Sequence, residues 1–184
     1  MEKYDSREDT EKHIANVGKY LNRACGMLTM RAIEHDASKL LPPEKECFDE
    51  ITPLLKGSTY GSEEYKATMD RMRPAIDHHQ KSNRHHPEYF DNGINGMNLI
   101  DLVEMICDWK AASERHADGD IYRSLEINKE RFGMSDQLVS ILKNTVDYMF
   151  PNSDIEQERL NGEAPMINLD DIPSQEGENV VDSE

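Results

Sequence analysis

Apolar residues in this chain recur at steps of three and four over most of the first 151 residues. Near the N-terminus the series is Ile14, Val17, Leu21, Ala24 and Leu28, and this spacing is typical of an amphipathic helix. No run of residues alternates between apolar and polar side chains as a half-buried strand requires. The sequence therefore predicts an all-α domain.

Prolines and loop-forming residues divide this region into about six to seven helices. Ser6 is expected to cap the first helix, Pro42-Pro43 to end the second, and Pro74 to kink or break the fourth. The predicted helices cover residues 6–28, 44–55, 63–83, 97–116, 120–131 and 135–149, and 30–40 either continues the first helix or starts a new one. We expect them to form a single compact bundle over residues 1–151.

The C-terminal residues 152–184 differ in composition from the rest of the chain. They contain ten acidic residues and one arginine, so they carry −9 of the total formal charge of −16. Such a segment is too charged and too poor in apolar residues to form a core. We expect a disordered acidic tail, in which 164–172 (APMINLDDI) is a candidate docking motif for a protein partner.

Composition excludes several classes of protein. The net charge of −16 argues against a broad nucleic-acid surface, which needs clustered Lys and Arg. No apolar run approaches the length of a membrane span, and the N-terminus has no secretory signal. Cys25, Cys47 and Cys107 are far apart and form no CxxC pair. We therefore expect a cytoplasmic protein, in the host cytoplasm if a phage encodes it.

Histidines and acidic residues occur in a pattern that favours a metal centre. Six of the seven histidines lie between His13 and His86, and Asp101, Glu104 and Asp108 share one face of an otherwise apolar helix. A carboxylate on a buried helix face is costly unless it is paired or binds a metal. Imidazole and carboxylate together suit ions such as Zn, Mn, Fe or Co.

Each group also has an ordinary structural interpretation. His13 could be a surface residue, His85-His86 could cap a helix, and the acidic row could pair with Lys110 or Arg115. Their joint occurrence on at least three predicted helices favours one or two divalent ions, with Mg added to the candidates above.

Three segments resemble the motifs of the HD-domain metal-dependent phosphohydrolase superfamily. Residues 32–40 (AIEHDASKL) resemble its LLHDIGK signature, and 105–112 (MICDWKAA) resemble the helix that carries its last Asp ligand. Between them, His78-His79 and 85–93 (HHPEYFDNG) resemble the region found in members with more than one metal. The same span is similar to a small group of uncharacterised phage and bacterial proteins.

The resemblance implies an HD-like helical bundle and a set of ligands. A first metal would be held by His13, His35, Asp36 and Asp108. Asp36 would bridge to a second ion, whose other ligands would be His79 and either His85 or His86. Lys39 would contact a substrate phosphate or stabilise the acidic site.

The reaction implied is hydrolysis of a nucleotide or related small phosphate ester by metal-activated water. Glu88, His78 and the spare histidine of the 85/86 pair are candidates for the general acid. Arg31, Lys81 and Arg84 are the further candidates for phosphate contacts. The GYP element of cyclic-dinucleotide enzymes is absent.

Two other functions remain open at this point. Some HD-fold proteins use a pair of irons to activate oxygen, and the His-rich ligand set permits that chemistry. A non-catalytic, metal-stabilised binding module is the other alternative. The apolar residues of 135–149 could serve either as core or as the face of a homodimer.

Overall fold

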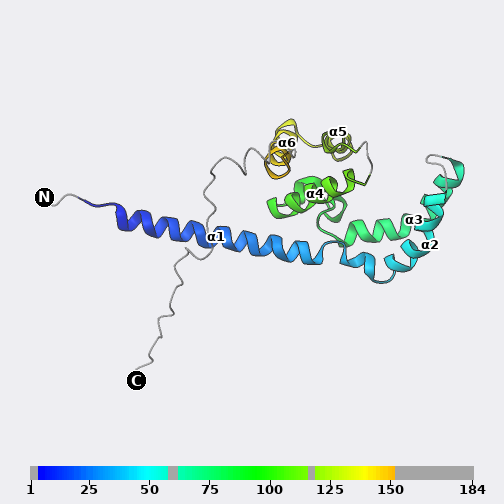
Figure 1. Cartoon of the computed structure of the whole chain (residues 1–184), viewed down its shortest axis with the longest axis horizontal. Helices are drawn as coiled ribbons and strands as arrows, with labels where there is room; N and C mark the ends of the chain where they lie inside the picture. The colour runs from blue at the N-terminus through cyan, green and yellow to red at the C-terminus, as the bar shows by residue number, and fades with distance from the viewer. Residues whose placement is uncertain (1–3, 58–61, 116–118, 152–184) are drawn as a thin grey trace, which may run out of the picture. The chain divides into compact units, whose positions relative to one another are not determined.

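The computed structural model describes residues 4–57, 62–115 and 119–151. In this part of the chain it contains six α-helices, three short 3-10 helices and no strand (Figure 1). The prediction of an all-α protein is confirmed. The predicted tail, 152–184, and its candidate docking motif lie outside the described residues.

The helices follow the order of the predicted ones. They are α1 (Arg7–Glu34), η1 (Ala37–Leu40), α2 (Glu44–Gly57), α3 (Glu63–Ser82), η2 (Pro87–Tyr89), η3 (Gly93–Gly96), α4 (Leu99–Ser113), α5 (Ile121–Phe132) and α6 (Asp136–Met149). Two compact units divide the chain, residues 1–143 and residues 144–184, and the described part of the second begins with the end of α6. None of the described helices is long and apolar enough to cross a membrane.

Helix α1 differs most from the prediction. It runs as one helix from Arg7 to Glu34, so the segment from Met30 continues the first helix as far as Glu34, and no side-chain hydrogen bond from Ser6 caps it. The following segment forms a separate 3-10 helix, η1, instead of the end of a second α-helix. Pro74 does not end its helix either, because α3 continues through it to Ser82.

An apolar core lies between α4 and α5. Met105 and Ile106 of α4 and Leu125 of α5 have no exposed surface, and the rings of Trp109 and Phe132 stack with their centroids 6.2 Å apart. Large apolar side chains buried in this way are the main source of stability in a helical domain. Helix α1 packs on α4, and α2 packs on α3.

The ends of α4 and α5 are fixed by side-chain caps. Asn98 accepts hydrogen bonds from the backbone N–H groups of Ile100 and Asp101, while Asp101 Oδ2 accepts one from the N–H of Asn98. This reciprocal capping box sets where α4 begins. Asp120 caps α5, and Gly133 ends that helix with a φ of +60°, which a glycine adopts without strain.

Candidate metal centre

A sharp turn after α1 positions the HisAsp pair. His35 is the residue that follows α1, and Asp36 adopts a left-handed backbone with a φ of +57° before η1 begins. Non-glycine residues rarely adopt this conformation, although Asp is among those that tolerate it best. It directs the chain into η1, whose Lys39 then lies with its Nζ 2.5 Å from Asp36 Oδ2.

Helix α4 presents a row of carboxylates to the end of α1. Arg31 and His35 are four residues apart on α1, and Asp101, Glu104 and Asp108 follow at steps of three and four on α4. Arg31 donates to Asp101 at 2.8 Å and to Glu104 at 3.0 Å. His35 lies between Glu104 and Asp108, with its Nδ1 3.1 Å from Glu104 and its Nε2 3.6 Å from Asp108.

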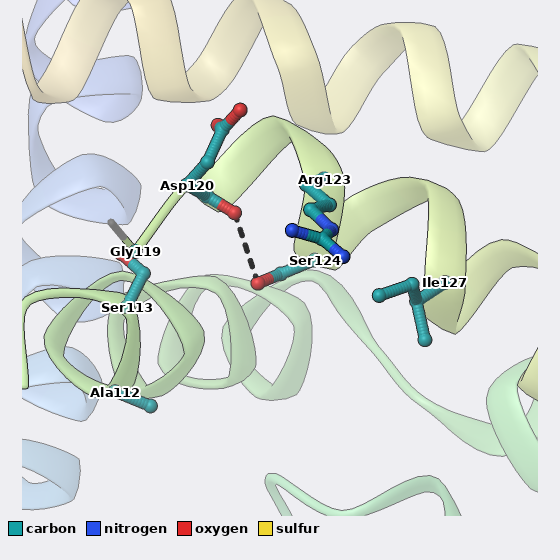
Figure 2. Close-up of a pocket in the computed structure, with 7 residues that line it drawn as sticks. All are labelled: Ala112, Ser113, Gly119, Asp120, Arg123, Ser124 and Ile127. Carbon is teal, nitrogen blue, oxygen red and sulfur yellow. Dashed lines mark hydrogen bonds between the residues drawn. The ribbon is translucent and has the colours of Figure 1, made fainter. Parts of the chain in front are cut away.

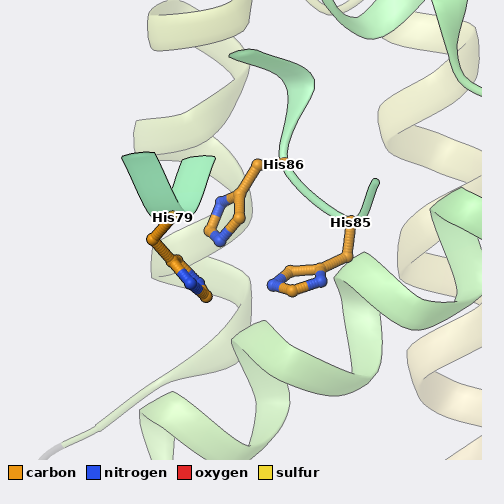
Figure 3. Close-up of side chains that lie close together, drawn as sticks. All are labelled: His79, His85 and His86. Atoms are coloured by element: carbon orange, nitrogen blue, oxygen red, sulfur yellow. The ribbon is translucent and has the colours of Figure 1, made fainter. Parts of the chain in front are cut away.

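Three further histidines come from the end of α3 and the segment after it. His79 is in the last turn of α3, and His85 and His86 precede η2. Figure 3 shows their imidazole rings turned toward one another, with centroids 4.8 Å apart for His79 and His86 and 4.2 Å apart for His85 and His86. One ring nitrogen from each lies within 4.8 Å of the others, a spacing that a single metal ion could bridge.

The carboxylate of Asp36 joins these histidines to the α1–α4 pair. Its Oδ1 lies 3.1 Å from Nε2 of His79 and 3.4 Å from Nε2 of His85. Its Oδ2 lies 3.7 Å from Nε2 of His35. Asp36 is thus central to a cluster of six side chains that we call the His/Asp cluster. Its members are His35, Asp36, His79, His85, His86 and Asp108.

Four atoms of the His/Asp cluster are buried without a hydrogen-bond partner. They are Asp36 Oδ1 and the Nε2 atoms of His79, His85 and His86. Burying a polar atom without a partner is costly, and native proteins rarely leave several together. The donor set suits a divalent ion, because neutral imidazole and carboxylate are its usual ligands. The residues therefore fit a metal, which would satisfy all four atoms.

The Nδ1 atoms of His35, His79 and His85 contact buried carboxylates. Glu44 Oε2 lies 2.9 Å from Nδ1 of His79, and Glu104 Oε1 lies 3.1 Å from Nδ1 of His35 and of His85. A carboxylate that accepts the Nδ1 proton leaves the lone pair on Nε2, where a metal could take it. The histidines are thus oriented as metal ligands usually are.

Glu44 is itself held by neighbours on both sides. Its side chain is fully buried at the start of α2, where Ser38 donates to Oε2 at 3.0 Å and His78 lies 2.7 Å from Oε1. Ser38 receives a hydrogen bond from Asn83 at 2.8 Å. The Ser38 hydroxyl thus anchors the carboxylate behind His79.

The charge states in the cluster follow from these contacts. Proximity to Asp108 raises the pKa of His35 to about 9, although burial opposes the shift. Burial lowers the pKa of His86 to about 3, with a further contribution from His85 and His79. Burial alone would raise the pKa of Asp36, but the nearby rings of His79 and His85 and the hydrogen bond from Lys39 bring it well below its usual range. Burial would also raise the pKa of Asp108, but the imidazole of His35, 3.6 Å away, lowers it.

His13 is not brought to the cluster. It is exposed on α1, 22 positions before His35 on the same continuous helix, which corresponds to about 33 Å along the axis. The predicted ligand set is corrected on this point, because a straight helix separates the two side chains. The other six predicted ligands, among them both His85 and His86, lie together.

Two predicted phosphate contacts are already engaged by carboxylates. Arg84 makes a bidentate pair with Asp101, through Nε at 3.0 Å and Nη2 at 2.9 Å, and Arg31 binds Asp101 and Glu104. Asp101 has no exposed surface, so these contacts compensate a buried charge. Lys81 is exposed in the last turn of α3.

The candidates for the general acid are placed differently from one another. His78 contacts Glu44, and its side chain is 45% exposed. Glu88 forms an ion pair with Arg131 of α5 at 2.7 Å. His86 is the half-buried member of the 85/86 pair.

Sequence reasoning did not identify Glu44 as part of the site. It lies in the charged run EKE after Pro42-Pro43, where no periodic pattern separates it from Glu46. The sequence places Glu104 in a row of carboxylates on one helix face, but only the structure shows its contacts with His35 and His85.

A pocket of about 390 Å³ borders the cluster. Its lining includes His85 and Glu104 of the site, together with Arg31, Glu34, Asn83 and Tyr89. A second pocket, of about 280 Å³, lies where α4 ends and α5 begins (Figure 2). The polar groups of Asp120 in that pocket already serve α5, since its side chain caps the helix and its carbonyl accepts from Ser124 at 3.1 Å.

Fold and site together define an all-α protein with a candidate His/Asp metal centre. The chain belongs to the family of unknown function DUF5662, whose profile matches residues 2–148. No curated protein and no solved structure matches the chain.

Proposed function

We propose that this chain is a metal-dependent phosphohydrolase that acts on a nucleotide or a related small phosphate ester. The observation that carries the proposal is the convergence of four buried atoms without partners, Asp36 Oδ1 and three histidine Nε2 atoms. The order of the motifs, HisAsp, then paired histidines, then Asp, adds the resemblance to the HD superfamily described above.

Six side chains would hold the metal. His35, Asp36 and Asp108 form one candidate set, and His79, His85 and His86 form another, with Asp36 Oδ1 within 3.4 Å of His79 and His85. A divalent ion held by such ligands lowers the pKa of water from 15.7 to about 7 and so supplies hydroxide at neutral pH.

The protein's own part is to orient the rings of these ligands. Glu44 and Glu104 accept the Nδ1 protons of His79, His35 and His85, which fixes the tautomer. Lys39 compensates the charge of Asp36 from 2.5 Å.

His78 is the side chain that we assign to proton transfer to the leaving group. Glu44 binds His78 through Oε1 and His79 through Oε2, so one buried carboxylate joins this half-exposed imidazole to a metal ligand. An imidazole that is oriented by a carboxylate and open to solvent is a common general acid. Neither Glu88, which is paired with Arg131, nor the half-buried His86 combines these two properties.

The phosphate contacts must be revised to fit the ion pairs. Arg31 and Arg84 neutralise Asp101 and Glu104, so they act behind the ligands. Lys39, beside Asp36, is the cation best placed to meet a substrate phosphate. The bound metal would then compensate most of the charge on the phosphate.

The first test is the metal content of the purified protein, measured element by element per chain. One or two equivalents of Mn, Fe, Zn, Co or Mg, with phosphate release from a nucleotide panel, would support the proposal. Asp36→Ala should lose both metal and activity, while Asp91→Ala, at an exposed carboxylate, should keep them. Full metal content in Asp36→Ala would exclude Asp36 from the centre.

A second function is favoured by the number of imidazoles. Four histidines and two aspartates form a nitrogen-rich set that also suits iron. Iron as the dominant metal, with oxygen consumption and no phosphate release, would favour a di-iron oxygenase. Metal that is retained without either reaction would favour a non-catalytic binding module, and absence of metal after soaking would refute all three.

A further inference from the structure

Helix α1 exposes an apolar stripe over its N-terminal two thirds. It has 28 residues, and none of them is buried. Ile14, Tyr20 and Leu21 are 63%, 66% and 61% exposed, and Val17 and Met27 are also exposed. A projecting helix of ordinary composition is only marginally stable in water, because helices depend on burial of an apolar face. Another surface is needed to cover this stripe.

The stripe contains a heptad pattern, in which Tyr20 and Met27 take position g beside the apolar a and d residues Ile14, Val17, Leu21, Ala24 and Leu28. Residues 14, 17, 21, 24, 28, 31 and 35 are spaced alternately by three and four, as the a and d positions of a coiled coil are. The last of these positions, Arg31 and His35, contact α4 of the same chain. The seam therefore begins as an exposed surface and ends inside the protein. Position e holds the small residues Gly18, Cys25 and Ala32, which allow a second helix to approach closely.

We propose that a second copy of this chain covers the stripe, with the two α1 helices packed antiparallel. In an antiparallel pair each a position lies opposite a d position. Two registers give four apolar layers, and the one that uses the exposed Ile14 instead of the half-buried Leu28 puts Ile14 opposite Ala24 and Val17 opposite Leu21, with both layers repeated by two-fold symmetry. This gives four consecutive apolar layers centred near residue 19.

The position of α4 selects the antiparallel arrangement. A parallel partner would continue along α1 to its C-terminal end, where α4 already packs against Arg31 and His35. An antiparallel partner instead overlaps the exposed N-terminal part of α1 and directs its own α4 to the opposite end of the pair. Two copies can then share the stripe without competing with the contacts that position His35.

The exposed area is sufficient for a specific pair. The five large apolar side chains of the stripe would remove on the order of 500 Å² per copy, or roughly 1,000 Å² in total, which reaches the lower range of specific interfaces. Burial of this apolar surface in both copies would be the main contribution to the stability of the dimer.

The oligomeric state of the full chain tests the proposal. Light scattering after size exclusion, over a range of concentrations, should give twice 21.2 kDa. Leu21→Lys should raise the dissociation constant by on the order of 100-fold, because both chains of a symmetric dimer carry the substitution and each puts a charge into an apolar layer. Asn22→Lys is the matched control, since it adds the same charge beside the stripe and should leave the dimer intact. Circular dichroism checks that both variants remain folded.

Cross-linking tests the orientation. Tyr20 is at position g. In an antiparallel pair the g positions of the two copies share one flank of the seam, whereas in a parallel pair they lie on opposite flanks. Cys25, at position e, is exposed but about 18 Å along the axis from its counterpart in the antiparallel register and on the opposite flank in a parallel pair, so oxidation of the unmodified chain should give no disulfide through it in either case. Tyr20→Cys, close to the two-fold axis, should cross-link. A monomeric chain, a dimer insensitive to Leu21→Lys, or a Tyr20→Cys variant that does not cross-link would overturn the proposal.

Discussion

Glu44 Oε2 lies 2.9 Å from Nδ1 of His79, and the side chain of Glu44 has no exposed surface. The same carboxylate contacts His78 and accepts a hydrogen bond from Ser38. A buried carboxylate with three partners holds its position firmly. Glu44 therefore controls the orientation of a candidate ligand without belonging to the His/Asp cluster itself.

Replacement of Glu44 by Gln should lower metal affinity by about 10- to 100-fold, the usual effect of losing a carboxylate behind a metal-binding histidine. The amide keeps one acceptor but presents an N–H group in place of the other, so it cannot accept from both His78 and His79. Competition with a chelator measures the affinity. Glu46→Gln, at an exposed position in the same turn, should have no effect. Unchanged affinity in Glu44→Gln would remove Glu44 from the site.

Arg84→Lys should destabilise the protein by about 1–3 kcal/mol and leave the metal content unchanged. Lysine keeps the charge but cannot form the bidentate pair that Arg84 makes with the buried Asp101. Urea denaturation measures the free energy of unfolding. Arg73→Lys, at an exposed position on α3, is the control. Loss of phosphate-ester hydrolysis without loss of stability would instead place Arg84 at the substrate, as the sequence predicts.

Local patterns in the sequence were sufficient for the helices and for most of the cluster. Three- and four-residue spacing predicted the helices from α2 to α6, because each buries one face. His35, Asp36, His79, His85, His86 and Asp108 were found from the order of their motifs, which is a property of the chain itself. The carboxylates Asp101, Glu104 and Asp108 were placed on one face by the geometry of an α-helix.

The remaining errors concern long-range pairing. Arg31 and Arg84 were assigned to phosphate because they are near histidines in the sequence, but their partners lie on α4, 70 positions away in the case of Arg31 and Asp101. Glu44 gave no signal because its role depends on the packing of α2 against α3. His13 was misplaced because the sequence does not show that α1 continues without interruption through Leu28.

His13→Ala should retain the full metal content, since His13 is exposed and about 33 Å along α1 from His35. His35→Ala should lose metal, because that ring belongs to two of the three groups of potential ligands. Elemental analysis of both variants compares their metal content per chain. Loss of metal in His13→Ala would contradict the placement of α1 or require a contribution from a second copy.

Stability of the metal-free protein should be greatest near pH 6.5, the ordinary pKa of histidine. The pKa of His35 is raised to about 9, so the stability that it contributes is complete below pH 6.5 and is lost as the pH rises through 9. The pKa of His86 is lowered to about 3, so its contribution is complete above pH 6.5 and is lost as the pH falls toward 3. Urea midpoints of the chelator-treated chain across this range should therefore pass through a maximum.

Bound metal should abolish the alkaline part of this profile, because a ligated His35 carries no proton to lose. His35→Gln should abolish it in the metal-free chain as well, for the same reason. The acidic part should persist in His35→Gln, since it depends on His86. A metal-free protein whose stability rises steadily from pH 6.5 to pH 9 would show that His35 is not held in its protonated form beside Asp108, and the charge assignment of the cluster would have to be reversed.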